Sequence, residues 1–407
     1  MKVDTMRRID YFVGVPLCFL LQLWFALLHL LVRPKTQRPE KMLFIELSEM
    51  GSAILVDPAL REAKAQGATL YFVIFKKNKA SLDLLKTIPE ANIFTLRDDG
   101  LFALGIDTLK FLIWTRRQRI DTVVDLELFS RFTALLSRLS GASNLVGFDA
   151  FHNEGLYRGR FLSHRVAYNP THHISKNFMA LIHAAFSEKN ELPFTKRRIE
   201  DNEIQLAKAA NDPEGQAQIR QLITQCYPDY QPEQQRLVLI NPNASDLLPQ
   251  RRWPPERFIQ VMKSLVEQYE DVLVLITGAP AEATQAQTLT QAVDHPRCIN
   301  FAGKLRFDQL VPLYQLSELM LTNDSGPGHF AAVTELPTYV IFGPETPALY
   351  GSLGNSTPIY AHLACSPCVS ASNHRKTPCQ DNVCLQAIHP EQVFQQLKKQ
   401  LDAIRAI

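Results

Sequence analysis

The sequence predicts an α/β protein with two parallel-sheet domains and an N-terminal membrane helix. Two stretches of the chain alternate short aliphatic runs with helical segments, and a polar, glutamine-rich segment separates them. A mostly apolar run occupies residues 11–32. Strands that alternate with helices form parallel sheets, because each helix carries the chain back across its sheet.

The same observations predict four segments. Residues 1–41 form a membrane anchor and linker, and residues 42–199 form an N-terminal α/β domain. Residues 200–236 contain little core-forming material beyond one amphipathic helix, so we expect the domain boundary there. Residues 237–407 form the second α/β domain, which ends in a cysteine-rich tail.

Composition excludes some classes of protein. Of 407 residues, 46% are hydrophobic and 21% are charged, which is ample for two packed cores. The 43 Lys and Arg nearly balance the 41 Asp and Glu, so no global basic field suggests a nucleic-acid partner.

Residues 11–32 are long enough to span a bilayer. Basic residues flank both ends and no small-residue cleavage site follows, which is typical of a retained anchor. The larger positive excess on the C-terminal side predicts that the body of the protein is cytoplasmic. Gly14 and Pro16 leave a shallow hairpin or interfacial segment as an alternative to a single span. A buried core helix is the third alternative.

The loop after the predicted strand at residues 319–321 has the composition of a diphosphate site. It contains Asp324, Ser325, Gly326, Gly328 and His329. Glycines let the backbone approach an anion, helix amides face it, and His329 supplies a further donor. A second strand follows directly, so the loop is expected at the carboxyl edge of a parallel sheet, where such sheets bind ligands.

This Asp-Ser-Gly-x-x-His pattern, followed by an alanine-bearing helix, a Pro-Thr strand and Phe-Gly-Pro at residues 342–344, resembles the heptosyltransferase-like glycosyltransferases of family 9. The resemblance covers roughly residues 42–393. It implies two Rossmann-like domains facing a cleft, the GT-B fold, and a nucleotide-diphosphate-sugar donor. It also implies inverting transfer to a lipid-linked, polysaccharide or lipopolysaccharide acceptor at the inner membrane.

Three further loops resemble the family. Ser245 and Arg251 lie where the family contacts the diphosphate, with Arg251 in the place of a lysine. Gly278 and Glu282 match a nucleoside-binding stretch. A solvated surface loop remains the alternative for Arg251, and a helix-start dipole partner remains the alternative for Glu282.

The catalytic base is where the sequence departs from the family. The family usually carries Gly-Asp in the first strand–helix turn, whereas this chain has Gly51 and Ser52. Glu49 is the nearest carboxylate able to replace the aspartate as base. If Glu49 only caps the helix, the protein is a catalytically silent, nucleotide-sugar-binding or scaffold subunit. No Asp-x-Asp motif stands out, so catalysis is expected to need no metal.

A loop-rich region after residue 148 is expected to recognise the acceptor, although solvated side chains are the alternative. Its polar and aromatic residues are Arg131, His152, Asn153, Glu154, Tyr157, Arg158, Arg160 and His164.

The tail carries Cys365, Cys368, Cys379 and Cys384. This spacing favours a structural zinc site, with disulfides or unlinked thiols as alternatives.

Overall fold

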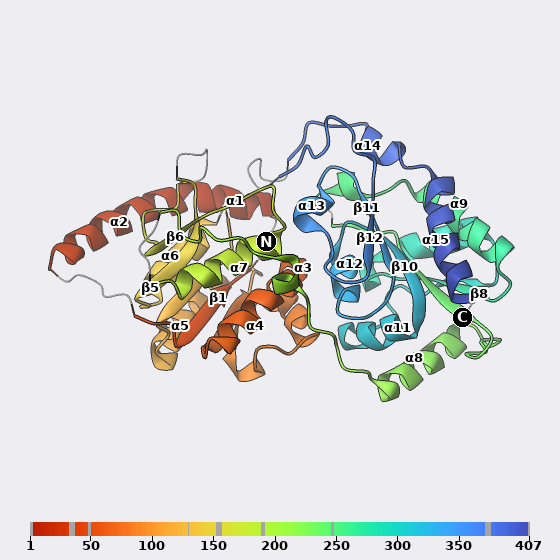
Figure 1. Ribbon diagram of the computed structural model, residues 1–407, viewed down its shortest axis with the longest axis horizontal. Helices are drawn as coiled ribbons and strands as arrows, with labels where there is room; N and C mark the ends of the chain where they lie inside the picture. Colours follow the sequence, from red (N-terminus) through yellow and green to blue (C-terminus); the bar gives the residue numbers. More distant parts are fainter. Residues whose placement is uncertain are drawn as a thin grey trace. The chain divides into compact units, whose positions relative to one another are not determined.

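The computed structural model describes residues 3–31, 37–47, 50–128, 130–151, 157–188, 192–245, 248–370 and 376–405. Two compact units, Met1–Gln205 and Leu206–Ile407, divide the chain (Figure 1). The division lies inside the polar segment 200–236.

The first unit is built on a six-stranded parallel sheet with the order β3-β2-β1-β4-β5-β6. Its interior strands are aliphatic and buried on both faces, as expected where helices cover both sides. The strands are β1 (Lys41–Ile45), β2 (Thr69–Phe75), β3 (Ile93–Leu96), β4 (Thr122–Asp125), β5 (Asn144–Asp149) and β6 (His164–Ala167).

Helices of the first unit cover both faces of this sheet. Helices α4 and α7 are in contact, and so are α5 and α6. These elements are α3 (Met50–Leu55), α4 (Asp57–Ala65), η1 (Lys76–Asp83), η2 (Glu90–Asn92), α5 (Leu101–Gln118), α6 (Arg131–Leu139), α7 (Ile174–Ala185) and η3 (Asp201–Ile204).

The N-terminal apolar segment forms α1 (Val3–Phe12) and α2 (Gly14–Leu31). Helical hydrogen bonds continue across the junction, from Val13 N to Ile9 O at 2.9 Å and from Leu17 N to Val13 O at 3.2 Å, so the hairpin alternative is wrong. The stretch Thr5–Leu28 is long and apolar enough to cross a membrane by length and composition. Only 11% of its apolar window is buried, so it is not a core helix.

The second unit repeats the design with the order β12-β11-β10-β7-β8-β9, again entirely parallel. Two parallel-sheet α/β domains, as predicted, are therefore confirmed. The strands are β7 (Arg236–Asn241), β8 (Val272–Ile276), β9 (Cys298–Asn300), β10 (Ser317–Asn323), β11 (Thr338–Phe342) and β12 (Ser356–Tyr360).

Helices of the second unit also pack in pairs, with α15 against α9 and α8 against α11. The apolar core between sheet and helices includes Trp253 and Phe258, both fully buried. The elements are α8 (Pro213–Cys226), η4 (Pro249–Arg251), α9 (Pro255–Gln268), η5 (Pro280–Glu282), α10 (Ala283–Val293), η6 (Phe307–Gln309), α11 (Leu310–Leu316), α12 (Gly326–Ala331), α13 (Pro347–Tyr350), α14 (Val383–Gln386) and α15 (Pro390–Arg405).

Candidate functional site

The carboxyl edge of the second sheet collects most of the predicted site residues. Strand β10 lies between β7 and β11, so the loops that follow these three strands are neighbours. Asp324 and Ser325 follow β10, the loop at residues 242–245 follows β7, and Glu345 follows β11. The topology therefore brings together segments that lie far apart in the sequence.

Asn323, the last residue of β10, organises this edge and was not predicted. Its Nδ2 donates to Pro242 O at 2.8 Å, and its Oδ1 accepts from Trp253 N at 3.1 Å. Asn323 is fully buried. It therefore fixes both the loop after β7 and the chain leaving η4 against the end of β10.

A buried charge cluster lies at the same edge. Arg251 Nη1 is 3.8 Å from Asp324 Oδ2 and 3.8 Å from Glu345 Oε2. The two carboxyl side chains are only 4% and 3% exposed. Glu345 was also missed, although it directly follows the Phe-Gly-Pro sequence that was recognised. Arg251 is thus not a solvated surface residue.

One positive charge faces two carboxyl groups whose burial raises their pKa values. Burial and repulsion by Asp324 raise the pKa of Glu345 to about 8, although Arg251 opposes the shift. Burial also raises the pKa of Asp324, again against the effect of Arg251. The two carboxyl groups therefore hold one proton between them at neutral pH. Among the described residues, Arg251 Nε and Asp324 Oδ2 have no hydrogen-bond partner.

Helix α12 begins directly beside this cluster. Ser325 is its N-cap and donates from Oγ to Asn323 O at 3.1 Å. His329 is largely buried, and its Nδ1 lies 3.4 Å from Ser352 Oγ.

The two glycines of α12 are packed by protein atoms. A Cβ on Gly328 would lie 3.0 Å from Ser352 Oγ, and one on Gly326 would lie 3.0 Å from the Phe330 ring. Both glycines therefore serve close packing, a role that the prediction of an anion-binding loop did not include.

The loop after β7 is held by Arg252, the neighbour of Arg251. Arg252 donates from Nε and Nη2 to Ala244 O at 3.0 and 2.7 Å. Ser245 comes next and is exposed. The tandem arginines thus point to different partners: Arg252 fixes the loop, and Arg251 faces the carboxyl groups.

Gly278 and Glu282 lie at the end of the adjacent strand β8. A Cβ on Gly278 would lie 2.8 Å from both Asn243 Nδ2 and Glu282 Oε2, so only glycine fits without movement. Glu282 Oε2 accepts from Ala279 N at 2.6 Å. Glu282 therefore caps the helix start, which is the alternative role that its sequence position predicts.

The cysteine-rich segment supports the charge cluster from outside. Cys368 N and Val369 N donate to Pro344 O at 3.0 and 3.1 Å, directly before Glu345. Asn382 Nδ2 donates to Gln250 O at 2.7 Å, directly before Arg251. The segment therefore fixes the backbone directly before Glu345 and directly before Arg251.

The thiols of this segment lie near one another. Burial and the three other thiols raise the pKa of Cys384. Thr377 Oγ1 donates to Cys368 Sγ at 3.4 Å, and Cys379 Sγ donates to Asp381 Oδ1 at 3.3 Å. Within the described ranges, no three His, Cys, Asp or Glu side chains are arranged to hold a metal ion.

The first strand–helix turn of the N-terminal unit is only partly described. Glu49, the predicted base, lies outside the described residues, whereas Gly51 and Ser52 belong to the first turn of α3. Asp57 is buried and bound by Arg61 Nε at 2.9 Å.

The carboxyl end of β4 carries a second buried cluster, which was not predicted as a site. Arg158 pairs with Asp125 and donates from Nη1 to Glu127 O at 2.7 Å. Burial raises the pKa of Asp125 to about 6. Glu127 Oε1 accepts from Leu47 N at 3.1 Å, so this carboxylate lies beside the chain that follows β1.

Several residues expected to bind an acceptor have internal partners instead. Arg131 and His164 are buried, and Tyr157 OH donates to Gln22 Oε1 at 3.0 Å. Residues 152–156 lie outside the described part of the chain. An acceptor role for this region thus cannot rest on Arg131, His164 or Arg158, and it remains a proposal for the others.

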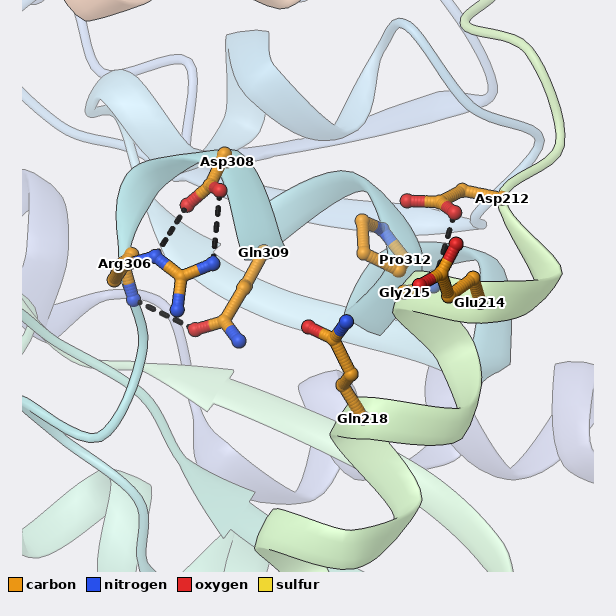
Figure 2. Close-up of a pocket in the computed structure, with 8 residues that line it drawn as sticks. All are labelled: Asp212, Glu214, Gly215, Gln218, Arg306, Asp308, Gln309 and Pro312. Atoms are coloured by element: carbon orange, nitrogen blue, oxygen red, sulfur yellow. Dashed lines mark hydrogen bonds and ion pairs between the residues drawn. The ribbon is translucent and has the colours of Figure 1, made fainter.

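A separate hollow of about 280 Å³ lies on the second unit, between the starts of α8 and α11 (Figure 2). Arg306 directs its guanidinium at Asp308, with contacts of 3.1 and 2.9 Å. Asp212 Oδ1 accepts from Gly215 N at 2.9 Å. Carboxylates outnumber the single arginine, so the hollow does not suit an anion, and none of the predicted site residues lines it.

Known heptosyltransferases resemble this chain both in sequence and in fold. Lipooligosaccharide heptosyltransferase 2 of Campylobacter jejuni is 28% identical over 169 residues, which are 40% of this chain and 51% of the relative. This chain thus spans about half the length of that relative.

Two solved structures share the fold. The structure of Escherichia coli ADP-heptose lps heptosyltransferase II has a TM-score of 0.68 at 18% identity, covering 90% of this chain and 99% of its own. E. coli heptosyltransferase WaaC with ADP has a TM-score of 0.60 at 14% identity, covering 88% and 99%. Both domains therefore have the GT-B-like arrangement of elements found in those proteins.

The model of the family described as glycosyltransferase family 9 (heptosyltransferase) matches residues 115–377, which is more than half of the chain. The matched region contains β7, β10, β11 and the whole Arg251–Asp324–Glu345 cluster. The chain therefore belongs to glycosyltransferase family 9.

Proposed function

We propose that the protein is a membrane-associated, inverting glycosyltransferase that uses a nucleotide-diphosphate-sugar donor. The observation that carries the proposal is the incompletely bonded Arg251, which is 13% exposed and lies beside α12 at the carboxyl edge of the sheet. A planar guanidinium suits bidentate binding of phosphate oxygens. The acceptor we propose is lipid-linked glycan, polysaccharide or lipopolysaccharide at the cytoplasmic face of the inner membrane.

For the donor, Arg251, Ser325 and His329 are proposed to hold the diphosphate, with Ser245 and the α12 backbone. Asp324 is proposed to position Arg251, because a buried carboxylate would repel a phosphate. Gly278 and Glu282 are proposed to face the nucleoside. The E. coli relative with the full-length structural match is named for ADP-heptose, so ADP is the first nucleotide to test.

The proposed reaction is a single displacement. The acceptor hydroxyl oxygen bonds to the anomeric carbon as the bond from that carbon to the diphosphate breaks. Glu49 takes the hydroxyl proton, and Arg251 with His329 stabilises the leaving diphosphate. Glu127 is a second candidate base because its carboxylate binds the backbone that leads into the same turn. No divalent ion is required in this scheme.

For the cysteine-rich segment we propose a structural zinc bound by Cys365, Cys368, Cys379 and Cys384. The structure places these thiols near one another but not in a binding arrangement, so zinc would have to draw them together. Zinc would fix the backbone beside Glu345 and Arg251, since the segment already binds the carbonyls of Pro344 and Gln250. It would take no part in sugar transfer.

The experiment that tests the function combines donor binding with turnover in the detergent-purified protein. Thermal stabilisation is measured with ADP and other nucleoside diphosphates, for wild type and His329→Ala. Transfer from the matching nucleotide sugar is then compared among wild type, Glu49→Gln and Glu127→Gln. We expect ADP to stabilise wild type and His329→Ala to lose that shift. Glu49→Gln should lower turnover by at least about 100-fold while it leaves ADP binding intact.

The alternative function is a catalytically silent, nucleotide-sugar-binding subunit of a glycan assembly complex. The observation that favours it is Ser52, which cannot take a proton unaided. It would be supported if wild type bound nucleotide but transferred no sugar in the presence of a lipid acceptor. An absence of any nucleotide shift would contradict both functions.

A further inference from the structure

The N-terminal helix binds the first unit along one face. The residues that turn towards the unit are Asp10, Gly14, Cys18, Gln22 and Phe25, spaced three to four apart as one helical face requires. In Figure 1, α1 and α2 lie along the first unit next to α6, which both helices contact.

At its start the helix is fixed to the first turn of α6. Asp10 Oδ1 accepts from Phe132 N at 2.9 Å, and Asp10 Oδ2 lies 3.1 Å from Arg131 Nη1. A Cβ on Gly14 would lie 2.8 Å from Arg131 Cβ, so only glycine allows this close approach. Cys18, one turn later, is fully buried.

The helix is also fixed near its other end. Gln22 Oε1 accepts from Tyr157 OH at 3.0 Å and from Arg160 N at 3.1 Å. The guanidinium of Arg138 lies 3.5 Å from the centre of the Phe25 ring. At about 1.5 Å per residue, the docked length from position 10 to position 25 is roughly 22 Å.

The opposite face is wholly apolar. Residues 11–28 contain no charged side chain, and Phe12, Trp24 and Leu27 are 72%, 61% and 62% exposed. A surface helix usually turns its polar face outward, whereas here Asp10 and Gln22 face the protein. The outer face therefore has the composition of a surface that meets an apolar medium.

We infer that this helix lies in the plane of the membrane, docked on the protein by its inner face and inserted into one leaflet by its outer face. A single span would carry α6 with it. Arg131 and Arg138 would then enter the roughly 30 Å hydrocarbon layer, where each charge costs about 2.5–3.5 kcal/mol or more.

Lipid fits the outer face better than a second protein copy does. Protein interfaces have an apolar centre and a polar rim, but this face is apolar for its full length. Arg7, Arg8 and Arg38 lie just outside the apolar run, where basic side chains meet anionic headgroups. The mean hydropathy of 2.0 also matches a membrane segment.

The in-plane arrangement has a consequence for the proposed acceptor, and this step alone rests on the proposed function. Helix α6 begins at the carboxyl edge of the first sheet, and Asp10 binds its first turn. The membrane surface therefore lies beside that edge, where a lipid-linked acceptor would approach the start of α3.

The test is the depth of single tryptophans in vesicles of phosphatidylcholine and phosphatidylglycerol. Trp24 is replaced by Phe in the full chain, and one Trp is placed at Phe12, Leu20 or Leu27. Lipids brominated near the headgroup or near the chain end quench each Trp, and the Trp24→Phe protein supplies the background. We expect all three positions to be quenched more strongly by the shallow bromines.

A span would give a different depth profile, with Leu20→Trp quenched most strongly by the deep bromines and the two end positions by the shallow ones. That profile overturns the inference. A protein that forms dimers but does not bind vesicles also overturns it, because the outer face would then be covered by protein.

A charge-insertion pair supplies an independent measurement. Leu20→Glu with Trp24→Glu should lower vesicle partitioning by about tenfold or more without changing Tm, because each side chain buries apolar area in lipid. Leu192→Glu, at an exposed apolar position outside the helix, should leave partitioning unchanged. The inference would be contradicted if wild type, the Leu20→Glu/Trp24→Glu variant and the Leu192→Glu variant all partitioned equally onto vesicles. No readout involves sugar transfer, so an inactive protein does not affect the result.

Discussion

Each sheet ends in a buried cluster of one arginine with carboxyl groups, but the two arginines are bonded very differently. In the first unit, Arg158 pairs with Asp125, and its three nitrogens also donate to backbone carbonyls and a threonine hydroxyl at 2.7–3.5 Å. In the second unit, Arg251 lies 3.8 Å from both Asp324 and Glu345. Its Nε has no hydrogen-bond partner among the described residues.

The difference separates a structural arginine from one with capacity to bind a ligand. Buried polar atoms are nearly always hydrogen-bonded, and a buried donor without a partner costs about 1–3 kcal/mol. Arg158 has no remaining capacity, so its bonds stabilise the first unit. Arg251 retains a donor, and an anion would complete its bonding.

The largest expected effect is that of Arg158→Ala. Removing one partner of a buried ion pair costs about 3–5 kcal/mol in the free energy of unfolding, and the carbonyls that Arg158 binds would lose their donor. Urea unfolding of the first unit measures this loss. Arg160→Ala, at an exposed position, is the matched control and should change stability by less than about 0.5 kcal/mol. ADP affinity should be unchanged in both. If Arg158→Ala were as stable as wild type, Arg158 could not be called a structural arginine in contrast to Arg251.

The next effect is that of Arg251→Ala on ADP binding. Hydrogen bonds to charged groups contribute about 1.5–3 kcal/mol, so affinity should fall by roughly 10- to 100-fold. Arg251→Lys should keep part of the affinity because it retains the charge but not the fork. Isothermal titration calorimetry measures the change. Arg306→Ala, in the hollow of Figure 2, is the control and should bind ADP as wild type does.

A third prediction concerns pH and Glu345. The folded pKa of about 8 lies above the ordinary value of 4.5, so the folded chain holds a proton that the unfolded chain releases. The free energy of unfolding should therefore fall as pH rises from about 4.5 to about 8. If the proposed diphosphate binds beside this pair, loss of the proton would repel it, so ADP affinity should weaken by up to about tenfold per pH unit above pH 8.

Glu345→Gln removes that titration. Its stability should change less between about pH 6 and about pH 9, and its ADP affinity should stay nearly constant there. Glu335→Gln, whose side chain is 80% exposed, keeps the wild-type pH profile as control. Identical profiles for wild type and Glu345→Gln would show that Glu345 does not hold the shared proton.

The smallest effect is expected from loosening the cysteine-rich segment. Cys384→Ser should abolish stoichiometric zinc, measured by metal analysis. It should also weaken ADP binding by about two- to fivefold, which is under about 1 kcal/mol. The reason is that the segment fixes the carbonyls beside Arg251 and Glu345 rather than the ligand itself. Cys226→Ser lies outside the segment and should change neither value. Zinc-free wild type with full ADP affinity would contradict the zinc proposal.

The sequence by itself determined the alternation of strands and helices, the division into two α/β domains and the segment at residues 324–329. These features depend on residues close together in the chain: aliphatic runs predict buried strands, and the Asp-Ser-Gly-x-x-His spacing lies within one strand-to-helix junction. Arg251 could be predicted as a site residue because its neighbours resemble a family pattern. The apolar character of residues 11–32 could likewise be predicted from neighbouring residues alone.

Only the tertiary structure decided which residues share one environment. Glu345 meets Arg251, Arg158 meets Asp125, and Asn323 binds the chain near Trp253, all across long separations in sequence. Likewise, Asp10 reaches Phe132 only because α1 packs on α6. Raised pKa values and missing hydrogen bonds come from burial and from neighbours that the sheet order supplies. A linear pattern does not contain that order, because parallel strands distant in the chain become adjacent only when the sheet forms.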